Sequence, residues 1–156
     1  MPDHPFAMHL RTQIDFFTCG TASLTEVDSA FAPQAEMMSV AAHAAHVVGT
    51  VDGFVDGVFS STGFDLNVAE HEAESRQVTS HASARTLLAE ARARAIGKLE
   101  GLLLAQLQKL IAPGPTMGGA PRLAMVSGLD DHTTHHRGVL AVYARLGGRV
   151  PVMPYA

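Results

Sequence analysis

Apolar residues recur every three or four positions along separate stretches of this chain, which is the spacing of one face of an α-helix. The first predicted helix runs from about Phe6 to Val27. The second begins after Ser39, a residue suited to cap a helix N-terminus, and ends before Gly63. Their inward positions are Leu10, Ile14, Phe17, Thr21 and Leu24 in the first, and Val40, Ala44, Val47, Val51, Phe54 and Val58 in the second. The spacing therefore predicts two amphipathic helices in the first part of the chain.

The second half of the chain repeats this spacing in two further stretches. A third helix is predicted from Thr79 or Ser80 to at least Leu99. A fourth is predicted from Arg122 to about Leu146, where two glycines stop it. The inward positions of the third helix are Leu88, Ala91, Ala95, Leu99 and Leu102.

The connections between these helices differ in length and composition. Residues 64–77 are acidic and hold few large apolar side chains, so we expect a long surface connection with at most a loose helical turn. A connection of that length suits a crossover between helices that do not form a hairpin. Residues 102–111 either extend the third helix or form a short helix of their own. Residues 112–121 are rich in glycine and proline and are predicted to be a loop.

Together these elements predict an all-α fold. We expect a four-helix bundle with a long crossover connection, a short extra helix before the last long one, and a single domain over residues 1–156. A hydrophobic content of 47% excludes intrinsic disorder. A net charge of -4 without a basic stripe argues against nucleic acid as a partner. No stretch has the roughly 18 consecutive apolar residues of a membrane span, so we expect no membrane partner either.

The cysteine and the N-terminal segment bear on localisation. Cys19 is the only cysteine and cannot form an internal disulfide, which fits a reducing compartment. His4 and His9 stand where a signal peptide needs an apolar core. We therefore expect a cytoplasmic protein. Cys19 itself is expected to be a buried structural residue, because no histidine is tied to it by spacing.

Histidine is unusually frequent, with nine residues among 156, and two of them interrupt an apolar seam. The seam of the fourth predicted helix is Met125, Leu129, His132, His136, Val139, Tyr143 and Leu146. His132 and His136 are four residues apart, so their side chains lie one above the other on the inward face. Two buried imidazoles without partners are costly, and two protonated rings repel each other. A shared metal ion binds neutral imidazoles and removes both difficulties. The alternative is a pair of hydrogen-bonded histidines in the core.

A metal site in a bundle needs a further ligand from another helix, and the second predicted helix offers His43 and His46. Both lie near its apolar face and either could face a neighbouring helix. Periodicity alone does not separate them well, but the spacing leans toward His43. His71 and His81 fall in or beside the acidic connection and are expected to be incidental to the site.

Four residues beside the histidine pair are further candidates for a role in the site. Asp131 and His135 could handle protons there, although Asp131 also suits a solvated surface and His135 lies about a hundred degrees from His136 around the helix. The stem of Arg137 is expected to pack along the helix while its guanidinium pairs with a carboxylate; the alternative is a guanidinium that binds a substrate anion. Tyr143 is expected in the core, with its hydroxyl reaching the bundle edge or the site.

These stretches resemble the DinB-like superfamily of small bacterial metal-binding four-helix proteins. The resemblance is carried by Asp-His-Thr-Thr-His-His-Arg-Gly at 131–138, the apolar run 140–146, and the ending Pro-Val-Met-Pro-Tyr at 151–155. The stretch 45–54 resembles the second-helix motif of the same superfamily, and the loop 117–122 also fits. The resemblance runs essentially from end to end.

The resemblance implies a bundle, often dimeric, that holds a divalent metal ion by three histidines. Carried over by position, these are His46, His132 and His136, so the motif selects His46 where periodicity favoured His43. Zinc or nickel is expected first, with iron, manganese or copper as alternatives. The chain departs from many members at Val139, where they have glutamine, and at Gly53, where they have an aromatic residue. Neither position is expected to be a ligand.

Three protein ligands leave positions on the metal for water or substrate, which is the layout of a catalytic site. Characterised relatives in this superfamily include S-transferases and an isomerase that use low-molecular-weight thiols. The resemblance therefore implies a small-molecule substrate and a thiol that attacks an electrophile with help from the metal. The alternatives are a metal-dependent hydrolase and a non-catalytic metal- or ligand-binding protein linked to stress. The resemblance alone also implies a homodimer.

Overall fold

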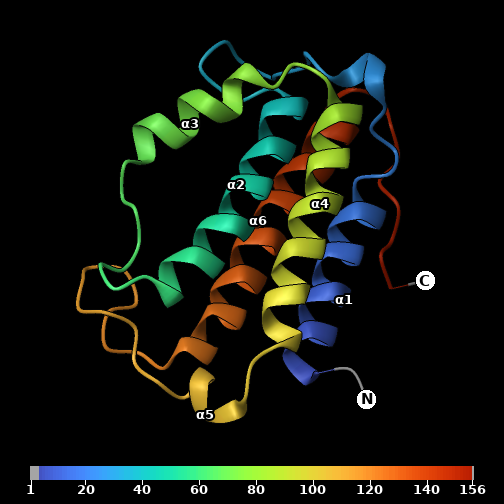
Figure 1. The fold of residues 1–156 in the computed structure, drawn as a ribbon. Coiled ribbons are helices and arrows are strands. Elements are labelled where there is room, and N and C mark those ends of the chain that lie inside the picture. Colours follow the sequence, from blue (N-terminus) through green and yellow to red (C-terminus); the bar gives the residue numbers. More distant parts are fainter. Residues whose placement is uncertain (1–3, 156) are drawn as a thin grey trace.

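The computed structural model describes residues 4–155; residues 1–3 and 156, which the predicted domain and the N-terminal segment include, lie outside the described part. Within it every regular element is helical, and strand-like pairing is limited to one isolated bridge between Leu110 and Pro121. Four long helices lie side by side (Figure 1): α1 (Pro5–Gly20), α2 (Val40–Phe59), α4 (His81–Glu100) and α6 (Met125–Leu146). The shorter elements are α3 (Val68–Gln77), α5 (Leu104–Leu107) and two 3-10 turns, Glu26–Asp28 and Arg122–Ala124.

The long helices form the predicted bundle. α2 packs against α4 and α6, and α1 packs against the same two helices from the opposite corner. Figure 1 shows α1 and α6 running in one direction and α2 and α4 in the other. α2 and α4 are therefore parallel neighbours rather than a hairpin, and the chain needs the long connection through α3 to return to the end at which both helices start. This confirms an all-α four-helix bundle with a long crossover.

Serine caps set the starts of two of the bundle helices. The Ser39 hydroxyl accepts a hydrogen bond from the Ala42 N–H at 3.2 Å, and α2 begins directly after it. Ser80 accepts from the Ser83 N–H at 3.1 Å at the start of α4. Each cap satisfies a backbone donor that has no partner within the helix. The predicted starts of both helices are confirmed.

The first helix is shorter than the sequence predicts. α1 ends at Gly20 rather than near Val27. The Thr21 hydroxyl donates to the Phe17 carbonyl at 2.8 Å, and a new 3-10 turn begins after Thr25. Thr21 and Leu24, the last two positions of the predicted seam, lie between α1 and this turn and are nevertheless buried, so the connecting segment continues the apolar face after the helix has stopped.

The acidic connection is more ordered than expected, because ten of its residues form α3. Within α3 the Arg76 guanidinium pairs with Glu72 one turn earlier at 2.7 Å, and it also donates to the backbone carbonyls of Glu36 and Met37. α3 also packs against α2. The contacts of α3 with other parts of the chain stabilise its helical structure, because its own sequence has no apolar face.

Most predicted seam positions lie in the core, but the C-terminal half of α6 departs from its predicted seam. Leu129 is almost fully buried as predicted, and burying a leucine contributes about 1.5–3 kcal/mol. Leu140, which the predicted seam did not include, is fully buried, whereas the predicted Val139 is only half-buried. Leu146 was expected to point inward, but 62% of its surface is exposed. The helix ends there, and Gly148 has a φ of 76°, a left-handed conformation suited to glycine. α5 confirms the predicted short helix before the last long one. In the described part of the chain, no helix combines the length and the apolar character needed to cross a membrane.

Candidate metal centre

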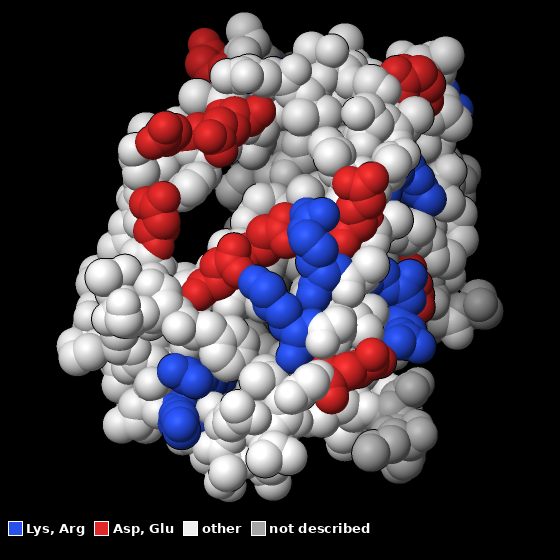
Figure 2. All heavy atoms as spheres, viewed as in Figure 1, with Lys and Arg blue, Asp and Glu red and all other residues white. Residues whose placement is uncertain are grey.

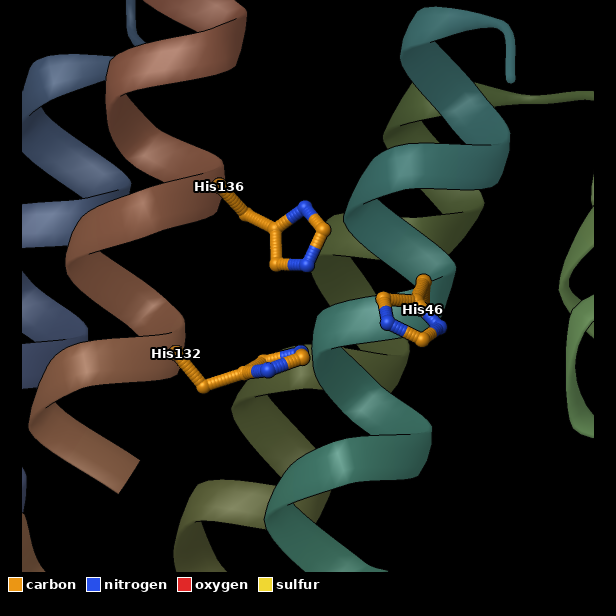
Figure 3. A group of neighbouring side chains, drawn as sticks. All are labelled: His46, His132 and His136. Carbon is orange, nitrogen blue, oxygen red and sulfur yellow. The ribbon is translucent and has the colours of Figure 1, made fainter. Parts of the chain in front are cut away.

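Three histidine side chains meet between α2 and α6. His46 comes from α2, and His132 and His136 come from α6; Figure 3 shows the three rings turned toward a common centre. One ring nitrogen from each lies within 4.8 Å of those of the other two. The ring centroids are 5.1 Å apart for His46 and His132, 4.8 Å for His46 and His136, and 4.4 Å for His132 and His136. The structure therefore brings together the three residues that the resemblance selects.

The bundle geometry explains why these residues meet. His132 and His136 are one helical turn apart on the face of α6 that packs against α2, as their spacing predicts. Val47 and Val51, which are fully buried, anchor the adjoining face of α2 in the core. His46 stands at the border of that buried face and is only partly buried, so its ring reaches the edge of the bundle.

Thr50 connects the two helices at the outer side of the group. Its hydroxyl donates to the His46 backbone carbonyl at 3.0 Å, and the same oxygen lies 2.9 Å from Nε2 of His132. The contact holds the His132 ring against α2. Sequence reasoning did not single out Thr50 as a site residue; its only sequence signal is its position one helical turn after His46.

A chain of hydrogen bonds holds the His136 ring from the inner side. The Tyr143 hydroxyl donates to the Met38 carbonyl at 3.1 Å, so its oxygen is left to accept from Nε2–H of His43 at 3.3 Å. Nδ1 of His43 then has a lone pair and accepts from Nδ1–H of His136 at 3.1 Å. A neutral imidazole carries one proton. Nε2 of His136 is therefore left with a free lone pair for the histidine group.

These contacts show which of His43 and His46 belongs to the three-histidine group. His46 belongs to the three-histidine group, whereas His43 is buried behind it and contacts the opposite nitrogen of His136. Spacing along α2 leaned toward His43, but the residue of α2 that belongs to the group is His46, and His43 instead contacts His136 from behind it. The hydroxyl of Tyr143 reaches the site, which is one of the two placements expected for it.

Burial keeps the group neutral. It lowers the pKa of His136 to about 3 and that of His132 to about 4, and repulsion from neighbouring imidazoles adds to the effect. Burial also lowers the pKa of His46, and it lowers that of His43 to about 4. At neutral pH all four rings are uncharged, which is the form that binds metal ions.

The other candidates lie outside this group. His135 is exposed, although its ring lies edge-on to that of His136 with centroids 4.8 Å apart. Asp131 is exposed, and no hydrogen bond among the described residues joins it to an imidazole. Of the two, His135 is the one whose side chain contacts a ring of the group.

Two expectations about other side chains are corrected. Cys19 lies on α1, which carries none of the three grouped histidines, and is half-buried rather than buried. Arg137 pairs with no carboxylate among the residues that the structure describes. Its stem packs over Gly20, its guanidinium donates to the Tyr155 hydroxyl at 2.9 Å, and it lies over the rings of Tyr155 and Phe16. Gly20 leaves room for the stem, since a Cβ there would lie 2.9 Å from the Arg137 Cδ.

A cavity of about 440 Å³ opens beside the histidines, between α2, α3 and the segment that joins them. His46 and His132 form part of its wall. A pocket of this size accommodates a small molecule, whose reacting group would then lie against two of the three histidines. His71, which was expected to be incidental, lines the cavity.

The donor set suits a divalent metal ion. Three neutral nitrogen donors on two rigid helices could hold zinc, nickel or another first-row metal, and the group includes no fourth protein ligand among the described residues. The neighbouring cavity gives a small molecule access to the same centre. The arrangement therefore fits an open site better than a closed structural one.

Comparison with known proteins is consistent with this geometry. No curated protein matches the chain significantly. A family model described as the DinB family matches residues 21–156, which include both helices that carry the histidines. The match covers most of the chain, and the all-helical bundle agrees with it. The chain therefore belongs to the DinB family.

Proposed function

We propose that this protein is a divalent-metal-dependent enzyme that transfers a low-molecular-weight thiol to an electrophilic small molecule. His46, His132 and His136 hold the metal, with zinc or nickel as the first candidates. The observation that carries the proposal is the position of two of these histidines in the wall of a cavity large enough for a small molecule. When bound, such a metal lowers the pKa of a coordinated thiol or water and so supplies a nucleophile at neutral pH.

The side chains around the group have distinct tasks in this proposal. His43 and Tyr143 hold the His136 ring in the tautomer that leaves Nε2 available. Thr50 positions His132. The thiol sulfur forms a bond to the electrophilic carbon, the leaving group departs with its electron pair, and the exposed His135 carries the thiol proton to solvent.

Elemental analysis of untagged protein tests the metal assignment. We expect about one divalent metal ion per chain, lost in His132→Ala and retained in His9→Ala, which changes an exposed histidine on α1. Wild-type protein that binds no stoichiometric metal after incubation with zinc or nickel would contradict the proposal.

Turnover tests the reaction. Metal-loaded protein is incubated with a panel of low-molecular-weight thiols and an electrophile, and thiol consumption and the thioether product are followed by mass spectrometry. We expect product formation that is lost in His46→Ala. A protein that binds metal but consumes no thiol would instead be the non-catalytic binding protein or the hydrolase, and hydrolysis of ester and amide substrates separates these two.

A further inference from the structure

The cavity beside the histidines has a largely apolar wall. Its large apolar side chains come from α2, α3, α4 and the segments on either side of α3, and they are Val48, Phe54, Phe64, Leu66, Val68, Val78 and Leu87. Apolar walls bind the body of a ligand by removing its surface from water. A ligand whose reacting group meets His46 and His132 would therefore place an apolar body along this wall.

The side of the cavity away from His46 and His132 carries acidic residues. Asp65 and Glu74 both line it, and His71 lies between them, with Nε2 3.3 Å from Asp65 and Nδ1 3.8 Å from Glu74. Figure 2 shows acidic side chains flanking a hollow beneath α3. No lysine or arginine belongs to the wall, as far as the described residues extend.

The basic residues of the neighbouring helix do not offset this charge. Arg94 of α4 pairs with Asp52 of α2 at 2.6 Å, and Lys98 pairs with Asp56. Each cation is thus matched by its own carboxylate, while Asp65 and Glu74 share a single imidazole. The electrostatic potential at the cavity mouth is therefore negative and disfavours an anionic ligand.

We propose that this cavity selects ligands with an apolar body and a neutral or cationic outer end, and that it excludes anionic ones. The inference rests on the proposed function in one respect, because it takes the cavity to be the substrate site of the same centre. It narrows the substrate and thiol to molecules without carboxylate, sulfonate or phosphate groups at the end that reaches the rim.

Two glycines in the wall allow the cavity to be filled without disturbing the bundle. Gly49 and Gly53 lie on α2, and a Cβ placed on either meets no other atom within 4 Å. A leucine at Gly53 would occupy cavity space and also favour the helix. Gly97 offers a matched control, since it lies in α4, is equally open and is not part of the wall.

The test uses three probes with one phenylbutyl body and different ends: trimethylammonium, hydroxyl and sulfonate. All three ends are weak metal ligands, and the full-length protein is treated with chelator, so the result does not depend on the metal. By isothermal titration calorimetry we expect the cation and the alcohol to bind at least about ten-fold more tightly than the sulfonate, a difference of about 1.4 kcal/mol. Gly53→Leu should weaken binding of the two favoured probes by about ten-fold or more, and Gly97→Leu should leave it unchanged.

A second variant tests the charge argument separately. Asp65→Asn combined with Glu74→Gln should bring the affinities for the cation and the sulfonate to within about three-fold of each other. The proposal is overturned if the sulfonate binds wild type as tightly as the cation, if no probe binds, or if Gly53→Leu, shown to be folded by circular dichroism, binds like wild type. Because metal analysis is a separate measurement, failure of this selectivity and failure of the metal assignment are distinguishable.

Discussion

Hydrogen bonds around the three histidines decide which ring nitrogen faces the centre of the group. The Met38 carbonyl can only accept, and this fixes the direction of each bond through Tyr143 and His43 to His136. A ligand ring held in the correct tautomer binds metal without first rearranging. Tyr143 and His43 are therefore positioning residues for His136.

Replacing Tyr143 with phenylalanine should weaken metal binding. The substitution keeps the buried ring but removes the oxygen that accepts from Nε2–H of His43, so His43 no longer favours the right tautomer of His136. Loss of such an outer partner reduces metal affinity by about 10–100-fold. Competition with a chromophoric chelator measures the dissociation constant. Tyr155→Phe is the control, since that hydroxyl bonds to Arg137, and equal affinities in the two variants would contradict the role given to Tyr143.

At the residue scale, the sequence predicts the relative positions of side chains on one helix better than those of side chains on two different helices. His132 and His136 follow from their spacing along α6, because a single helix sets their relation. His43 and His46 are three residues apart on α2 and both face the bundle, so periodicity gives only a weak preference, which was for His43. Which of them meets the α6 pair depends on the offset between two helices, and only the resemblance pointed to His46.

At the scale of elements, local signals predict helix starts and tertiary contacts decide the rest. The N-terminus of α4 illustrates both. Ser80 caps it locally, as its sequence predicts, but Ser29 also accepts from the His81 N–H at 2.9 Å, and Glu26 accepts from the Ala82 N–H at 2.8 Å. Those two acceptors come from a distant turn. The same dependence on distant contacts explains why α3 was expected to be only a loose turn.

Ser80→Ala should destabilise the protein by about 1 kcal/mol, because the Ser83 N–H loses its acceptor at the start of α4. Urea denaturation followed by circular dichroism measures the change. Ser83→Ala on the same helix is a matched control, since the exposed Ser83 side chain is not the cap; it should change stability by less than about 0.5 kcal/mol. Equal effects in both variants would remove Ser80 from the role of cap.

At the scale of the whole molecule, the bundle class follows from the periodicity, but the interior between elements does not. The cavity exists because α3 and the segment before it stand over one side of α2, and no spacing rule places them there. His81 is a second example. It was expected to be incidental beside an acidic connection, yet only 2% of its surface is exposed and neither ring nitrogen has a hydrogen-bond partner among the described residues.

His81 should make the fold sensitive to acid. Burial lowers the pKa of its imidazole below the ordinary value of 6.5, so the folded protein resists a proton that the unfolded chain accepts. The free energy of unfolding is not reduced by this group above pH 6.5, the ordinary pKa that applies to the unfolded chain. It decreases progressively as the pH falls from 6.5 toward the lower pKa of the folded protein. His81→Leu replaces the imidazole with an apolar side chain of similar size and leaves no polar atom of that side chain unpaired. We expect it to stabilise the protein by about 1–3 kcal/mol at pH 7.5.

In urea denaturation, the His81→Leu variant should also lose less stability than wild type between pH 7.5 and pH 5. The exposed His71 provides the comparison, and His71→Leu should stay within about 0.5 kcal/mol of wild type at pH 7.5. A His81→Leu variant less stable than wild type at both pH values would mean that the buried imidazole contributes packing or a hydrogen bond that outweighs its desolvation.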